Sequence, residues 1–337
     1  MSKFSFKSQK GFTLIELMVA LVLGLILVAA AIQLFTGGIL SSQLQRANAE
    51  IQDSGVFGVD YVLRDIRLAN VGNLTNLEIN DQTAYGGIVL TGSTASNTTN
   101  VNFVPKVEAA AYIDSTLLSR GSGDTVSSTD NYWKGLSNVK NTAGTAQISD
   151  QLTIQFVAPS QMFNCEGQIV YPGDLVVQRY FLRVDANGSG TSDIALACDA
   201  NTPATAADTV SSKPTAISGL GTAGQIIIPR VDHFHVLLKT RDEEGNKSYY
   251  TIPQYRAAAT AARATTPTAK KAPRILAIQA SVLIRSTNNA KNTVVDPAQA
   301  TYVMLDTTVK ATDTSNRFLR RAYNSTVALR NAMGENL

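Results

Sequence analysis

The sequence predicts an α+β fold in which one long N-terminal helix lies across an antiparallel β-sheet domain. Every residue from 17 to 32 is apolar or glycine, an apolar stripe with helical spacing continues to residue 69, and the strand-like runs all follow that stripe. With 337 residues, of which 44% are hydrophobic and 16% charged, the chain can bury a core. This composition excludes a disordered polyelectrolyte and a coiled-coil rod.

The N-terminal apolar segment is long enough to cross a membrane, because residues 14–35 would rise about 33 Å as a helix. Three of the 29 basic residues (Lys3, Lys7 and Lys10) lie in the first eleven positions, and the other 26 balance the 26 acidic residues. The positive-inside rule predicts that this leader stays in the cytoplasm and that the rest is exported. The balanced charge gives no reason to expect nucleic-acid binding.

Glu16 stands at the start of the apolar segment. A carboxylate there costs a few kcal/mol in lipid, so it needs a partner. If the chain is cut after Gly11, the new α-amino group lies on Phe12, four residues earlier. When such helices bundle, the carboxylate of one chain could neutralise the amino terminus of its neighbour, because low dielectric favours the pair over either charge alone.

The motif Lys10-Gly11-Phe12-Thr13-Leu14-Ile15-Glu16-Leu17 resembles the class III signal of type IV pilins and type II secretion pseudopilins. The resemblance implies that a prepilin peptidase cuts after Gly11 and methylates Phe12, and that Glu16 supports assembly. It divides the chain into a leader (1–11), a transmembrane half (12–36) and an amphipathic half (37–72) of the helix, and a periplasmic β-rich domain (73–337). An ordinary signal peptide, cut at the A-x-A site of residues 29–31, and a plain membrane anchor are the alternatives.

The second half of the helix is amphipathic. Beyond Gly37-Gly38, which is a candidate bend, apolar residues recur every three or four positions. This stripe must pack against something, and a β-sheet of the same chain is the obvious partner. We expect the helix to end near residues 70–73, where Asn and Gly favour a cap.

The rest of the chain is predicted to be loops and strands, with no second helix. The predicted strands are 87–90, 101–104, 110–113, 151–157, 174–184, 224–228, 231–240, 247–252, 275–285 and 301–311. The composition of residues 242–247 predicts a hairpin turn, and residues 199–218 and 257–272 are predicted to be loops.

Three further segments, residues 61–67, 231–236 and 317–331, resemble PilW-type minor pilins, which are related to the J-type pseudopilins of type II secretion. Residues 70–73 depart from the Gly-aromatic-Gly pattern expected there. The resemblance implies a non-catalytic minor pilin of the type IV pilus, without a cofactor, that helps to prime assembly and sits at or near the pilus tip.

The same resemblance implies the partners and the location. The expected partners are other minor pilins, the major pilin, the prepilin peptidase and the inner-membrane assembly platform, with a tip adhesin as a further candidate. Before assembly the chain would span the inner membrane once with its C-terminal domain in the periplasm, and afterwards it would be part of the pilus. A J-type pseudopilin, and a tip adhesin or DNA-binding module built on residues 73–150, stay open as alternatives.

Two features of the sequence could form a disulfide bond or bind a metal ion. Cys165 and Cys198 could form a disulfide in an oxidising periplasm, and two buried free thiols are the alternative. Residues 185–193 resemble the first nine positions of an EF-hand loop, with Asp185, Asn187 and Asp193 as weak candidate calcium ligands. The twelfth position is a leucine instead of an acid and the flanks are strand-like, which favours a plain hairpin loop.

Other motifs favour structural explanations. Residues 219–224 match G-x-G-x-x-G but lead into a strand, whereas a dinucleotide site needs a strand and then a helix. His233 and His235 alternate on one strand and could share a metal, but a third ligand is not evident, so a polar strand face is favoured. No catalytic motif is apparent, and an enzyme remains only a default alternative.

Two surface hypotheses concern recognition. A run of basic residues without acids could contact DNA, although a solvated loop explains it as well; its members are Arg256, Arg263, Lys270, Lys271 and Arg274. Tyr132 and Trp133 lie in a polar stretch, where they could form a recognition tip or pack on a satellite core.

Overall fold

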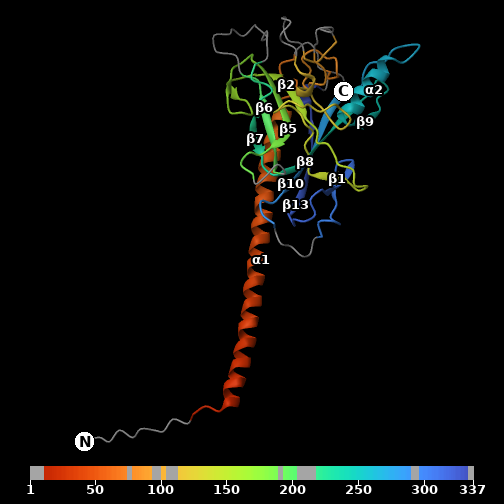
Figure 1. The fold of residues 1–337 in the computed structure, drawn as a ribbon. Helices are drawn as coiled ribbons and strands as arrows, with labels where there is room; N and C mark the ends of the chain where they lie inside the picture. Colours follow the sequence, from red (N-terminus) through yellow and green to blue (C-terminus); the bar gives the residue numbers. More distant parts are fainter. Residues whose placement is uncertain are drawn as a thin grey trace.

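A computed structural model describes residues 11–73, 78–92, 100–103, 113–188, 193–202, 218–289 and 296–332. Its longest element is the helix α1 (Leu14–Ile66), whose N-terminal half stands clear of a β-rich domain (Figure 1). The second half of α1 lies against antiparallel sheets of that domain. The predicted α+β class is therefore confirmed.

Helix α1 begins after Thr13 and continues through Gly37-Gly38, so the candidate bend is not a break in the helix. It ends at Ile66, before the predicted end at residues 70–73. The next residues form turns, and the N–H of Asn70, which has φ +69°, donates to the Gln155 carbonyl at 3.2 Å. The helix ends early because the chain beyond it bonds to the sheet.

Small residues on α1 let the helix approach the sheets closely. A Cβ atom added to Gly55 would come within 2.1 Å of the Tyr323 ring, and one added to Gly58 within 2.5 Å of Ile228. Near the end of the helix, the Tyr180 hydroxyl donates to the buried Asp65 carboxylate at 2.6 Å. The Tyr323 hydroxyl also donates to the Ile51 carbonyl of α1 at 3.0 Å, so close packing and hydrogen bonds both hold the amphipathic half to the domain.

Two four-stranded antiparallel sheets form the body of the domain. The first has the order β2 (Leu152–Val157), β5 (Leu175–Val184), β6 (Ile194–Ala200) and β7 (Gln225–Ile228). The second has the order β13 (Arg320–Ala328), β10 (Arg274–Arg285), β8 (Val231–Arg241) and β9 (Lys247–Tyr250). One hydrophobic core joins α1 to both sheets.

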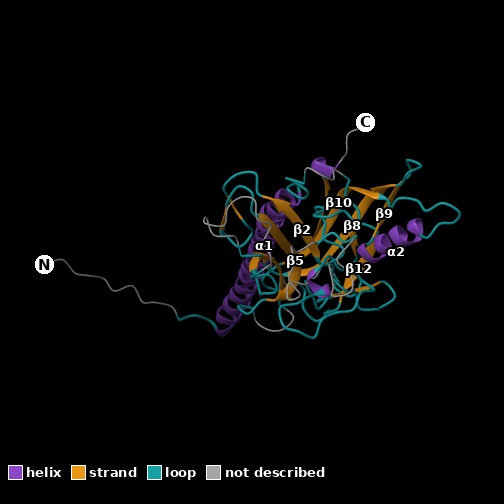
Figure 2. Cartoon of the chain, turned by 90° about the horizontal axis from the view of Figure 1, so that it is seen from above, coloured by secondary structure: helices purple, strands orange, loops and turns teal. Residues whose placement is uncertain are grey.

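Smaller elements complete the domain. A three-stranded sheet has the order β1 (Val139–Asn141), β12 (Thr307–Ala311) and β11 (Tyr302–Met304), and β3 (Met162–Phe163) pairs with β4 (Ile169–Val170). A second helix, α2 (Ile252–Arg263), lies on the opposite side of the strands from α1 (Figure 2). Two short 3-10 helices are η1 (Ser115–Leu117) and η2 (Arg330–Ala332).

The predicted strands that became β2, β5, β7, β8, β9 and β10 are confirmed to within two residues, and the predicted turn at 242–247 joins β8 to β9. The predicted strands at 87–90 and 101–104 are wrong, because the described residues there form only isolated bridges through Ile88 and Phe103. The predicted strand at 110–113 lies largely outside the described residues. The strand at 301–311 is a hairpin, because Leu305 turns the chain with φ +58°.

Both predicted loops need correction. Residues 257–272 include part of α2, so the expectation of strands alone after α1 is wrong. Thr251 and Gln254 form a capping box at the start of α2, and this pattern was visible in the sequence. Asp199 and Ala200, at the start of the other predicted loop, belong to β6, while residues 203–217 lie outside the described part of the chain.

Candidate assembly helix and buried polar sites

The N-terminus of α1 is closed by a capping box between Thr13 and Glu16. The Thr13 N–H and hydroxyl each donate to Glu16 Oε2 at 3.0 Å, and the Glu16 N–H donates to Thr13 Oγ1 at 3.3 Å. A carboxylate in the first helical turn also interacts favourably with the helix dipole. The Phe12 side chain, at 89% exposure, lies free beside this box. The T-x-x-E pattern was visible in the sequence, but there Glu16 was interpreted only as an assembly residue.

The first half of α1 is apolar and wholly uncovered. Every residue from 11 to 43 is exposed, and large apolar side chains occur all around the helix. Among the described residues, this is the one helix long and apolar enough to cross a membrane. Such a surface is stable in lipid or against other apolar helices, where the helix satisfies its own backbone groups.

A fully buried ion pair joins two strands of the first sheet. Arg179 Nε on β5 donates to Asp199 Oδ2 on β6 at 2.6 Å, and neither side chain is exposed. The remaining Arg179 nitrogens donate to carbonyl oxygens of Asn131, Thr222 and the Gln151 side chain. Burial lowers the pKa of Arg179, and the neighbouring Asp199 opposes that change. The buried pair therefore fixes two loops, those that contain Asn131 and Thr222, to the first sheet.

The loop at 219–224 is part of that arrangement. The N–H groups of Gly221 and Thr222 donate to the Asp199 carboxylate, at 2.8 and 3.3 Å. The loop then leads into β7, as predicted. The backbone N–H groups of this loop thus bind a carboxylate of the same chain.

A disulfide links Cys165 to Cys198, with the Cα atoms 6.1 Å apart. Cys165 lies in the turn of the β3–β4 hairpin and Cys198 in β6, so the bond ties the hairpin to the first sheet. Both residues are buried. The alternative of two free thiols is therefore not what the structure contains.

Comparisons with known proteins identify two regions of the chain. Residues 179–331 match the family model of Type IV Pilus-assembly protein W, and residues 6–32 match the prokaryotic N-terminal methylation motif. The chain carries the PilW region of type IV pilus-assembly proteins behind a prepilin methylation motif. No curated protein matches it. Among solved structures, the chain is similar to a type IV-like pilin, TTHA1219 from Thermus thermophilus, with 14% identity over 55% of this chain and 80% of that one and a TM-score of 0.27.

The PilW region begins within β5 and ends at η2, so it contains both partners of the Arg179–Asp199 pair. Members of this family are generally structural proteins that act with other pilus components. The resemblance inferred from the sequence is confirmed for the family and for the methylation motif.

A second buried ionic cluster of the PilW region is centred on Asp232. Its carboxylate accepts from Arg320 Nε at 2.7 Å, from Arg285 Nε at 3.1 Å and from the Asn138 amide at 2.9 Å. Arg285 also pairs with Asp193. The guanidinium groups of Arg285 and Arg320 lie 4.4 and 5.7 Å from the centre of the Phe318 ring. This cluster connects β8, β10 and β13.

The two histidines of the PilW region are structural. They lie on one face of β8, as predicted, with ring centres 6.3 Å apart. His235 bridges two carboxylates, with Nδ1 2.8 Å from Asp150 Oδ2 and Nε2 2.8 Å from Asp306 Oδ1. His233 Nδ1 lies within 3.0 Å of the hydroxyls of Ser137 and Ser149.

The pKa values of the two imidazole rings are shifted in opposite directions. Burial alone lowers the pKa of His235, but the bonds to Asp150 and Asp306 outweigh it and raise the pKa to about 10. Burial, aided by the charge of His235, lowers the pKa of His233 to about 3. At neutral pH, His235 is therefore an imidazolium between two carboxylates, and His233 is neutral.

The free energy of unfolding should fall as pH rises from about 6.5 to about 10. His235 keeps its proton in the folded state and loses it in the unfolded state over this range, so its stabilisation is complete below 6.5 and is lost by about 10. The contribution of one proton is about 1.4 kcal/mol per pH unit at most. Denaturant unfolding of the full chain in detergent micelles can follow the fluorescence of the single tryptophan, Trp133.

The matched variants for this experiment are His235→Gln and His233→Gln. His233 is neutral in the folded state over this range, and in the unfolded state it is almost fully neutral above about pH 7.5, so its replacement should leave the slope above that pH unchanged, whereas replacing His235 should flatten it. Equal slopes for wild type and His235→Gln would contradict the imidazolium bridge.

Two of the three candidate calcium ligands make other contacts in the structure. The Asp193 carboxylate pairs with Arg285, and Asp185 Oδ1 accepts the Asn187 N–H at 2.9 Å. The Asp185 N–H donates to the Asp193 carbonyl at 2.7 Å, which is the closing bond of a hairpin. In the described part of the chain no three His, Cys, Asp or Glu side chains are grouped to hold a metal ion.

The basic run is largely neutralised by acids from other segments. Four of its five members make ion pairs, which are Arg256–Asp124, Arg263–Asp81, Lys270–Glu244 and Arg274–Glu78. The run therefore does not present a block of uncompensated positive charge, as a phosphate-binding surface would.

Trp133 is a core residue. It is 1% exposed, and its indole N–H donates to the Ser149 carbonyl at 2.9 Å. Of the two interpretations of residues 132–133, the structure supports the contact with the core for Trp133. A recognition tip would need its ring at the surface.

Proposed function

We propose that the chain is a minor pilin of the type IV pilus, a non-catalytic subunit that helps to prime pilus assembly and sits at or near the pilus tip with other minor pilins. The observation that carries this proposal is the uncovered apolar half of α1 with Glu16 in its first turn, joined to a PilW region. In lipid that half would be an anchor, and against other helices it would be an assembly surface. The domain beyond residue 72 is bulky, which supports a low-copy position over a repeating one.

The partners of this subunit would be other minor pilins, the major pilin, the prepilin peptidase and the inner-membrane platform. Before assembly, the leader would be cytoplasmic and the domain periplasmic, in keeping with the lysines before residue 11. The disulfide between Cys165 and Cys198 is compatible with an oxidising compartment. During assembly, Glu16 of one chain would pair with the Phe12 amino group of its neighbour.

Processing can be tested directly. The mature protein should begin at Phe12 and carry a methyl group on its α-amino nitrogen, because we place the end of the leader at Gly11, within the residues 6–32 that match the methylation motif. N-terminal sequencing and intact-mass measurement of protein purified from membranes would show this. A mature start after Ala31 would instead support an ordinary signal peptide and remove the anchor on which the proposal depends.

Deleting the gene should reduce the number of surface pili, and the full chain should restore it. A small epitope inserted at the exposed residues 243–244, in the turn between β8 and β9, should then label pilus ends and not the length of the filament. Electron microscopy with gold-labelled antibody measures both quantities. Normal piliation together with loss of type II secretion would replace the proposal by a J-type pseudopilin. Labelling along the whole filament would contradict the position at the tip.

A further inference from the structure

Strand β5 is longer than the strand beside it. β2 pairs with β5 only as far as Tyr180, whereas β6 pairs with it as far as Val184. Before Leu152 the chain turns to the other sheet, where the Asp150 N–H donates to the Phe234 carbonyl at 2.9 Å. The end of β5 therefore has a neighbouring strand on one side only.

Backbone groups of Leu182 and Val184 point to the unpaired side. On β5 the Val177 carbonyl accepts from the Asn201 N–H at 3.0 Å, on the side of β6. The N–H and C=O groups of one residue point to the same side of a strand, and that side alternates from one residue to the next. Even-numbered residues of β5 therefore direct their N–H and C=O groups toward β2. Among the described residues, no partner bonds to the Leu182 N–H or C=O or to the Val184 N–H. Leu182 is only 3% exposed, and buried backbone groups are nearly always paired.

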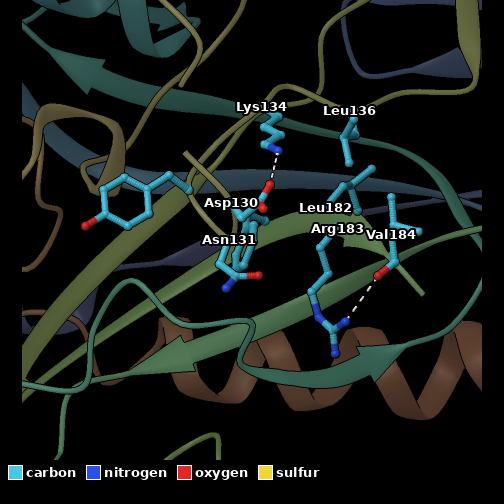
Figure 3. Close-up of a pocket in the computed structure, with 9 residues that line it drawn as sticks. Asp130, Asn131, Lys134, Leu136, Leu182, Arg183 and Val184 are labelled. Atoms are coloured by element: carbon cyan, nitrogen blue, oxygen red, sulfur yellow. Dashed lines mark hydrogen bonds and ion pairs between the residues drawn. The ribbon is translucent and has the colours of Figure 1, made fainter. Parts of the chain in front are cut away.

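A pocket of about 320 Å³ lies along this edge, and its other wall is formed by residues 130–132 together with Lys134 and Leu136 (Figure 3). Leu136, Leu182 and Val184 supply apolar surface. This volume is at the lower end of the range for ligand sites. It suits a short extended segment better than a folded partner.

The charged side chains that line the pocket favour the binding of an anion. The Arg183 guanidinium donates to the Val184 carbonyl at 3.1 Å and to the Gly224 carbonyl at 3.4 Å, while its Nε atom is buried without a partner. Lys134 pairs with Asp130 at 2.7 Å, but the Asp130 side chain is 91% exposed, so this ion pair is weak. Two cations, Arg183 and Lys134, thus line the pocket together with one solvated acid, Asp130.

We propose that the unpaired edge of β5 binds an extended, acidic segment of a partner protein. The segment would add a strand beside Leu182 and Val184, as peptides do at other exposed sheet edges. Side chains alternate between the faces of a sheet, so a carboxylate opposite Arg183 would lie on the same face of the sheet as the Arg183 side chain, and its two neighbours would contact Leu182 and Val184. This proposal does not depend on the role of the chain in a pilus.

The test uses the full chain in detergent micelles and a fluorescent, end-blocked peptide, Thr-Val-Thr-Val-Glu-Val-Thr-Val-Thr. We expect saturable binding that weakens roughly tenfold or more when the two valines beside Glu are N-methylated, because their N–H groups would pair with β5. N-methylation of the Glu itself should have little effect, since its backbone would face away in an antiparallel pair. Fluorescence polarisation measures each affinity.

Two variants separate charge from backbone pairing. Arg183→Gln should weaken the Glu peptide and not its Gln counterpart, whereas Val184→Pro removes an edge N–H and should weaken both. Arg321→Gln, at an exposed position of β13, is the control for a lost cation, and Trp133 fluorescence reports that each variant is folded.

Three results would overturn the proposal. One is the absence of saturable binding, both by this peptide and by any peptide from a displayed random nine-residue library. The second is equal loss of affinity on methylating the Glu or the valines. The third is binding of N-acetylglutamate amide as tight as that of the peptide, which would indicate a site for small carboxylates.

Discussion

Replacing Glu16 by alanine should leave the chain inserted in the membrane but reduce pili per cell by roughly tenfold or more. The carboxylate lies at the start of an apolar, uncovered helix, where its contacts within the chain are to Thr13. Once such helices bundle, a neighbour's Phe12 amino group would be left buried without a counter-charge in the variant. Membrane fractionation measures insertion, and electron microscopy counts pili.

A second variant separates assembly from capping. Glu16→Ala also removes the capping box, and loss of a cap costs about 1 kcal/mol. Thr13→Ala removes the cap and keeps the carboxylate, so it should reduce piliation much less than Glu16→Ala does. If the two variants behave alike, Glu16 acts as a cap and not as an assembly residue. Normal piliation in Glu16→Ala would also contradict the pairing.

The N-terminal half of the molecule could be predicted from the sequence because its determinants are local. An unbroken apolar run and a cap specify the helix, and the motif from Lys10 to Leu17 lies within the match to the methylation motif, without reference to any distant residue. The long strands β5, β8 and β10 were likewise visible as continuous β-prone runs. The structure refined the end of α1 because that end is set by the Asn70–Gln155 contact with the sheet.

The buried polar sites could not be predicted, because their partners lie far apart in the sequence. Asp150 meets His235 across 85 positions, and Asp232 meets Arg320 across 88. Neither acid belongs to a recognisable sequence motif. From the sequence alone, an acid between two strands is as easily interpreted as an exposed loop residue. The helix α2 is different, since its capping box was present at Thr251 and the Ala/Thr-rich run after it was interpreted as a loop.

Replacing Asp199 by asparagine should destabilise the domain by about 3–5 kcal/mol. The substitution keeps the shape of the side chain but leaves the fully buried Arg179 guanidinium without its counter-charge. The loop at 219–224 would also lose charge-assisted bonds, because the N–H groups of Gly221 and Thr222 donate to the same carboxylate. Denaturant unfolding followed by Trp133 fluorescence measures the change.

The control is Glu244→Gln, which breaks the ion pair with Lys270. Both of those side chains are about half exposed and solvent screens the pair, so the loss should be much smaller than that of Asp199→Asn. The double variant Arg179→Met/Asp199→Leu removes both charges, and it should cost less than the sum of the single variants, because no unpaired charge remains buried. If Asp199→Asn costs no more than Glu244→Gln, then water reaches Arg179, and the pair does not hold these loops to the sheet.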